Sequence, residues 1–317
     1  MILAALAAAE PAGWGASPAE LLPETRARVV AEADRALRRP ARPVARLASA
    51  GSDDLGDPAV AASREAFEDA DDAVLLALAF RATGEPRYRD GARGRLVDWA
   101  ATHVPTGNPV DETRLDALIH ARALLDEDDD DVRGWLARMR DAERAWRLGP
   151  RASVNNHRTH QLKMLLLLDE ALGDAGAFAA DRAAAEAHAA VNLDARTGES
   201  VDLRERRALY YHAYDLDAWL EIALLTQCCA APVTSAWRLL ERRLLAGDTR
   251  GEFVGSTEPL DAARANAGYG YGDAFDPRRA THALLTFHTW TRTATPLPAK
   301  VERRDLYALA RYQSWTR

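Results

Sequence analysis

Hydrophobic residues recur at helical spacing along most of the chain. The first periodic segment, SPAELLPETRARVVAEADRALRR, starts with Ser17, Pro18 and Glu20 in the order typical of an N-cap, a first-turn proline and an acid at N3. Residues 41–58 lose this periodicity and are rich in Gly, Asp, Ser and Pro. Long loops in compact domains are often functional lids. Residues 41–58 are therefore predicted to be either a lid or a plain surface loop.

From Asp69 onward, apolar periodic segments alternate with short breaks that contain Gly, Pro or a cluster of Asp. The later segments predict helices at roughly 131–147, 156–173, 175–191, 203–230, 232–246, 278–292 and 301–313. Short connections between long amphipathic helices favour antiparallel neighbours. The pattern therefore predicts an all-α fold of helical hairpins, which we expect to form a single domain over residues 1–317.

Composition limits the partners of the chain. A chain of 317 residues with 48% hydrophobic residues can bury a large core. The net charge of −7 provides no overall basic field for nucleic acid. No apolar run has the roughly 18 residues that a membrane span needs. We therefore expect neither nucleic acid nor membrane as a partner, and an anionic ligand would need a local basic pocket.

The start of the chain, MILAALAAAEPAGWG, is apolar but lacks the basic residues that open a signal peptide. It favours a cytoplasmic protein, or a periplasmic or secreted one if an export signal has been trimmed. No set of His, Cys or carboxylate residues has a convincing zinc spacing. The acidic run DEDDDD at 126–131 lacks the glycine and spaced oxygen ligands of a calcium loop. We therefore expect no metal and no other cofactor.

Two segments contain residues suited to chemistry. In the first, Asn155, Asn156 and His157 precede an apolar helix, and His160 follows one turn later. Free N–H groups and the positive end of the helix dipole lie at such a start, where a carboxylate can bind. One of the asparagines could simply be the N-cap. Two asparagines and a histidine in succession exceed what capping requires.

The second segment, residues 199–225, carries arginines and tyrosines at a helical repeat. Seven residues come within about 20° of two full turns, so Arg204 would share a face with Tyr211, and Arg207 with Tyr214. Buried arginine is costly without a partner, so this face suits the wall of an anionic cleft better than a core. A surface helix with extended arginines and half-buried tyrosines is the alternative.

Together, NNH at 155–157 and R-x-x-R-A-L-x-Y-H-x-Y-x-L at 204–216 resemble the paired active-site motifs of the alginate lyase family. Weaker similarity extends over roughly residues 60–230. The resemblance implies an incomplete (α/α) toroid and a lyase in which Asn156, His157 and Arg204 neutralise the substrate carboxylate. It also implies that Tyr211 is the catalytic acid and base. Neutralisation is needed because a proton beside a carboxylate is only weakly acidic, so its removal requires stabilisation of further negative charge.

The remaining candidates would bind substrate. They are Asn155, His160, Arg207, Tyr214, Tyr269 and Tyr271. The last two lie in the Gly-rich segment NAGYGYGDAF, where they could be sugar-stacking platforms or turn residues. His212 would point about 100° away from Tyr211 on a helix, which favours a structural role.

The expected function is a polysaccharide lyase that cleaves a β-linked polyuronate, of the polymannuronate or glucuronan type, by β-elimination. Its partner would be an anionic polysaccharide or oligosaccharide. One alternative is a glycoside hydrolase, which needs two carboxylates beside the bond. The candidates for that pair are Asp202, Glu205, Asp215 and Asp217. The other alternative is a non-catalytic helical scaffold that binds carbohydrate. The sequence leaves the oligomeric state open.

Overall fold

The computed structural model describes residues 21–48, 57–126, 128–266 and 270–315, which form helices and no sheet. This confirms the all-α prediction. Within the described residues, none of the helices combines the length and apolar character that a membrane crossing requires.

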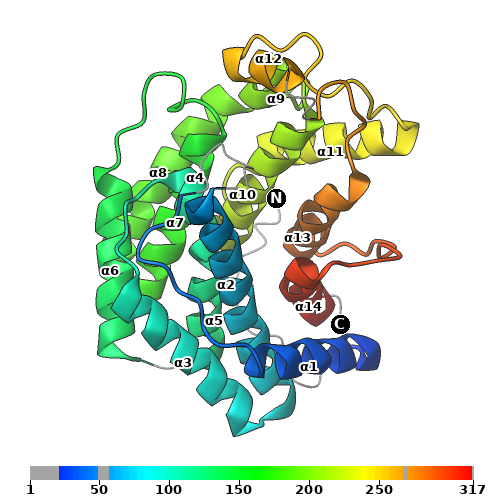
Figure 1. Cartoon of the computed structure of the whole chain (residues 1–317). Coiled ribbons are helices and arrows are strands. Elements are labelled where there is room, and N and C mark those ends of the chain that lie inside the picture. Colours follow the sequence, from blue (N-terminus) through cyan, green and yellow to red (C-terminus); the bar gives the residue numbers. More distant parts are fainter. Residues whose placement is uncertain (1–20, 49–56, 127, 267–269, 316–317) are drawn as a thin grey trace, which may run out of the picture.

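The helices alternate between an inner and an outer row of a curved array (Figure 1). The inner row consists of α2 (Pro58–Thr83), α5 (Asp116–Leu125), α7 (Asn156–Leu172), α10 (Leu209–Thr226) and α13 (Thr281–Thr291). The outer row consists of α3 (Pro86–Thr102), α6 (Asp130–Ala145), α8 (Ala175–Asn192) and α11 (Ala230–Ala246). The array is an incomplete (α/α) toroid of helical hairpins.

The remaining elements connect these rows or lie near the ends of the chain. They are α1 (Pro23–Leu37), α4 (Pro109–Glu112), η1 (Thr113–Leu115), α9 (Val201–Arg206), α12 (Pro259–Asn266), η2 (Pro277–Ala280), η3 (Arg303–Asp305) and α14 (Leu306–Trp315). Figure 1 shows α9 and α12 together at one end of the array, and α14 between α13 and α1.

Apolar patterning distinguishes the two rows. The outer helix α6 buries Trp135, Leu136 and Met139 on one face only, as expected of a surface helix. The inner helix α7 is buried on every side along most of its length, although polar residues such as Lys163 and Asp169 are among its buried side chains. Its Met164 and Leu167 join one core cluster, while Leu162 and Leu166 of the same helix join another. A helix buried on every side belongs inside the array, so α7 lies between the two cores.

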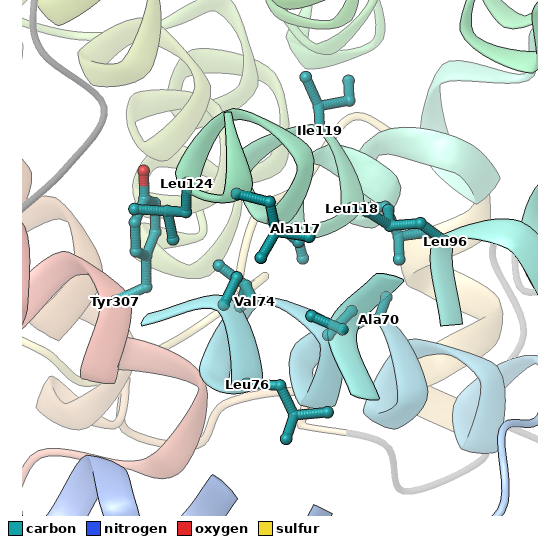
Figure 2. Close-up of a cluster of buried hydrophobic side chains, with 14 of the residues drawn as sticks. Ala70, Val74, Leu76, Leu96, Ala117, Leu118, Ile119, Leu124 and Tyr307 are labelled. Carbon is teal, nitrogen blue, oxygen red and sulfur yellow. The ribbon is translucent and has the colours of Figure 1, made fainter. Parts of the chain in front are cut away.

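The C-terminal helix α14 returns to the start of the array. Gln313 accepts a hydrogen bond from the Leu22 N–H at 3.2 Å and donates one to Thr25 Oγ1 at 3.0 Å. Tyr307 of α14 lies in the same apolar cluster as Val74 of α2 and Leu124 of α5 (Figure 2). These contacts close the gap that the curved array would otherwise leave between α13 and α2.

One predicted helix is in fact two. The segment 203–230 was expected to be continuous, but α9 ends at Arg206 and Arg207 takes a left-handed conformation with φ 52°. Glu252 accepts hydrogen bonds from the N–H groups of Leu209 and Tyr210 at 2.7 and 2.9 Å, so it caps α10. The Arg207 carbonyl accepts one from the Phe253 N–H at 3.1 Å. Hydrogen bonds from a distant segment therefore stabilise the break.

Other boundaries also differ from the prediction. Helix α2 begins at Pro58 rather than near Asp69, with the Asp57 side chain accepting from the Ala59 N–H. Helix α1 begins at Pro23, and Ser17, the predicted cap, lies outside the described residues. Of the predicted lid, residues 41–48 and 57–58 are described: the Ala48 N–H donates to Ser63 Oγ of α2 at 2.9 Å, and Asp57 and Pro58 form the start of α2. Its role as a lid remains a prediction.

Candidate active site

A cavity of about 350 Å³ lies between the inner helices. Its lining comes from α2, α5, α7, α10, α13 and α14, together with the three short η turns. Pockets of about 300 to 1,000 Å³ are typical of sites for small ligands. This cavity is therefore large enough for part of a saccharide chain.

Three exposed arginines lie among the lining residues, each from a different part of the chain. Arg114 belongs to η1, Arg279 to η2 and Arg304 lies in η3. The Arg279 guanidinium lies 4.7 Å from the ring centroid of Tyr210, another lining residue. We call these arginines the basic rim. They belong to no local motif, so the sequence alone does not indicate them. They supply positive charge, which an acidic protein needs to bind a polyanion.

His160 and Tyr214, both predicted to bind substrate, meet in the cavity where α7 packs against α10. Their ring centroids are 4.1 Å apart, and His160 Nδ1 lies 2.7 Å from Thr113 Oγ1. Burial lowers the pKa of His160 well below its usual range and raises that of Tyr214. The structure therefore brings both residues to the cavity in uncharged form.

The two asparagines at the start of α7 have different surroundings. Asn155 is the N-cap, and its side-chain oxygen accepts from the His157 N–H at 3.1 Å. Asn156 is buried and donates to Asp202 twice, from its side-chain amide and from its backbone N–H at 2.8 Å. Burial raises the pKa of Asp202 to about 6, although these hydrogen bonds oppose the rise. The pair fixes α9 against the start of α7.

Arg206 and Tyr211 form the closest contact between a cation and a ring near the cavity. The Arg206 guanidinium carbon lies 3.3 Å from the Tyr211 ring centroid, and the guanidinium is also ion-paired with buried Asp261. Burial and the charge of Arg206 both lower the pKa of His157, so this imidazole is neutral at neutral pH. Tyr211 lies on α10 between Tyr210 and Tyr214, which both line the cavity.

The structure does not bring Arg204 to Tyr211, so the expectation that they share a helix face is wrong. Arg204 is exposed, donates to the Glu199 carbonyl at 2.9 Å and lines a separate depression beside α8. Residues two apart on a helix point about 200° from each other, so Arg206 faces Tyr211 only if Arg204 faces away. Arg207 caps the end of α9 and is exposed rather than part of the cavity lining.

Of the two tyrosines of the Gly-rich segment, only Tyr271 is described, and it does not line the cavity. Tyr269 lies outside the described residues. Tyr271 is 41% exposed in a turn whose neighbours Gly270 and Gly272 have φ of 64° and 80°. Its role in binding sugar remains a prediction, and the geometry of a tight turn accounts for the two glycines.

A buried ionic cluster lies deep in the cavity. Arg311 of α14 donates to both carboxylate oxygens of Glu221 at 2.9 and 3.0 Å, and His282 Nε2 lies 3.3 Å from Glu221 Oε1. Burial alone would lower the pKa of His282, but Glu221, Asp217 and Asp305 together raise it to about 9. His282 is therefore protonated at neutral pH and ties α13 to α10.

We expect the His282 ion pair to stabilise the protein in a pH-dependent way. The folded-state pKa is above the unfolded value of about 6.5, so the contribution is complete below pH 6.5 and disappears as the pH rises through about 9. It amounts to at most about 3.5 kcal/mol, since one pKa unit corresponds to about 1.4 kcal/mol. Denaturant unfolding of wild type and His282→Gln at pH 6 and pH 10 measures it. An equal difference at both pH values would contradict this assignment.

No group of three or more His, Cys, Asp or Glu side chains in the described part of the chain is arranged to hold a metal ion. We expect exhaustive chelation to leave the rate of turnover unchanged. A loss of activity that calcium or zinc restores would contradict that expectation.

Comparisons with solved structures agree with the helical fold described above, as two of the matching structures show. An alginate lyase from Bacteroides ovatus matches with a TM-score of 0.60 and 13% identity over 90% of this chain and 92% of its own. Alginate lyase A1-III from Sphingomonas species A1 matches with a TM-score of 0.59 and 15% identity over 92% of this chain and 96% of its own. No curated protein matches the sequence.

The family follows from the sequence itself. A family model described as alginate lyase matches residues 31–229, which is more than half of the chain. The protein therefore belongs to the alginate lyase family, and it is a polysaccharide lyase. The match includes both segments that carried the resemblance, NNH at 155–157 and the arginine–tyrosine segment at 204–216.

Proposed function

We propose that the protein cleaves a β-linked polyuronate of the polymannuronate or glucuronan type by β-elimination, leaving an unsaturated uronate at the new end. The observation that carries the proposal is the stacking of Arg206 on Tyr211, with His157 nearby and the cavity beside them. An alginate lyase A1-III variant has been solved in complex with a tetrasaccharide. That complex supports an oligosaccharide or polysaccharide substrate for this fold.

In this mechanism Arg206 and His157 bind the carboxylate of the sugar that loses its proton. Arg206 supplies the positive charge, while neutral His157 donates a hydrogen bond. The first turn of α7 adds the positive end of a helix dipole. Asn156 is held by Asp202 and so acts from a fixed position. Together they stabilise the charge that develops as the proton leaves.

Tyr211 takes the proton and then returns one to the leaving glycosidic oxygen. A free tyrosine has a pKa of about 10, so a tyrosine base needs positive charge nearby. Arg206 supplies that charge, because its guanidinium lies against the Tyr211 ring. The sequence resemblance gave Arg204 the neutralisation of the substrate carboxylate, and the contact with Tyr211 supports Arg206 in that role instead.

A single proton carrier limits the substrate. In β-mannuronate and β-glucuronate, the departing proton and the leaving oxygen lie on the same face of the ring, so one group can serve both. In guluronate they lie on opposite faces, which requires two groups, each within hydrogen-bond reach of its own atom. We therefore expect activity on polymannuronate or glucuronan and little on polyguluronate.

A panel of polymannuronate, polyguluronate, glucuronan and glycosaminoglycans tests this expectation. The new double bond is measured by its ultraviolet absorbance. Preferential cleavage of polyguluronate would rule out the single-tyrosine mechanism and would point to His157 or His160 as an opposing base. Saturated products from every polymer would instead indicate hydrolysis.

The four carboxylates that the sequence offered for hydrolysis do not form a catalytic pair in the cavity. Glu205 is held by Arg151 through hydrogen bonds of 3.1 Å, while Asp202 is buried against Asn156. Asp215 is fully buried, and burial raises its pKa well above the usual range. Of the four candidates only Asp217 lines the cavity. A hydrolase needs two carboxylates on either side of the bond, and these positions supply one.

A further inference from the structure

The cavity has a closed inner end. Along α10 its lining runs from Tyr210 to Glu221, which is about 16 Å at 1.5 Å per residue. At the Glu221 end, Arg311 forms its two hydrogen bonds to that carboxylate, and Tyr307 packs against His120 with tilted rings and 4.9 Å between ring centroids. All four side chains are buried or nearly so. Helix α14 thus blocks this end, and a polymer cannot continue past it.

The charges differ between the rim and the interior. The basic rim, Arg114, Arg279 and Arg304, is exposed to solvent and can hold the carboxylates of a polyuronate. The interior alternates cations with acids, including Lys163 paired with Asp116 at 2.5 Å and His282 beside Glu221. The interior cations already have acidic partners, so they are poorly placed to pair with a run of uronate carboxylates, whereas the acids can accept hydrogen bonds from the hydroxyl groups of one terminal sugar.

Asp217 is the interior group best placed to bind a hydroxyl. It lines the cavity on α10, between Tyr214 and Glu221, and is only half-buried. Its Oδ1 accepts no hydrogen bond from the described residues, although it is shielded from solvent. Buried polar atoms of this kind normally have a partner, so a ligand hydroxyl would complete the site.

We propose that the cavity binds the end of the polyuronate chain, with Asp217 accepting a hydroxyl of the terminal sugar and the basic rim holding the next units. Cleavage then takes place beside Tyr211 at the mouth of the cavity, and the enzyme shortens its substrate from the end. The inference rests on the proposed lyase reaction and adds its mode of attack.

Long polymannuronate and glucuronan test this mode in one experiment that follows viscosity, double-bond absorbance and product length. We expect unsaturated products of one or two sugars from the start, with viscosity falling only as they accumulate. A rapid early fall in viscosity with a ladder of long unsaturated products would overturn end-wise attack and leave the lyase reaction standing. Absence of any unsaturated product would overturn the lyase reaction itself, and end-wise attack with it.

A variant tests the role of Asp217 separately. We expect Asp217→Ala to raise KM for the polymer by about tenfold with kcat little changed, as for the loss of a buried hydrogen bond. Asp141→Ala on the outer face of α6 is the matched control, and its KM should equal that of wild type. Thermal unfolding of both variants reports folding. A wild-type KM in folded Asp217→Ala would remove Asp217 from substrate binding.

Discussion

Tyr211→Phe is expected to lower turnover by about 10²-fold or more while the fold and substrate affinity are kept. The change removes only a hydroxyl, and a phenylalanine ring keeps the stacking on Arg206 and the edge contacts with Tyr210 and Phe253. A factor of about 10² to 10⁴ is usual when a general acid or base is lost. Steady-state kinetics on the best polymer of the panel measures it.

Tyr88→Phe is the matched control for that experiment. The Tyr88 hydroxyl donates to Asp34 at 2.8 Å between α3 and α1, and Tyr88 is not among the residues that line the cavity. Its loss should cost some stability and leave turnover unchanged. Near wild-type activity in Tyr211→Phe would remove Tyr211 from the mechanism.

The same substitution is expected to have a large effect on turnover at Arg206 and almost none at Arg204. We expect Arg206→Gln to reduce turnover by about 10² to 10³-fold, because it removes the positive charge at the developing enediolate. Arg204→Gln should be close to wild type, since this side chain lies on the exposed side of α9 and bonds to the Glu199 carbonyl. The two variants make the same chemical change two residues apart.

Stability must be separated from catalysis in this pair. Arg206→Gln leaves Asp261 buried without its ion-pair partner, which typically costs about 3 to 5 kcal/mol. The double variant Arg206→Gln/Asp261→Asn removes both charges and should recover much of that loss, but not the turnover. If Arg204→Gln lost activity and Arg206→Gln did not, the assignment taken from the sequence motif would be right and the one taken from the structure would be wrong.

The sequence by itself determined most of the helices and the family. Helical periodicity and capping are encoded within a few neighbouring residues, so α7 was predicted to begin at Asn156 and does so, with Asn155 as its cap. The continuous apolar run at 164–168 in α7 likewise reflects its place in the inner row. The short motif at 155–157 and the longer one at 204–216 were sufficient to indicate the family.

Only the tertiary structure decided which arginine faces Tyr211. The break after Arg206 depends on Glu252, which lies 43 residues beyond Leu209 and caps α10 in place of a local side chain. No local rule predicts such a cap, and a continuous helix would have placed Arg204 on the face of Tyr211. The basic rim and the closed end of the cavity depend in the same way on η1, η2, η3 and α14. These elements come from three separate parts of the chain, since α14 follows η3 directly, so long-range packing and hydrogen bonding, rather than any local pattern, bring their charges together.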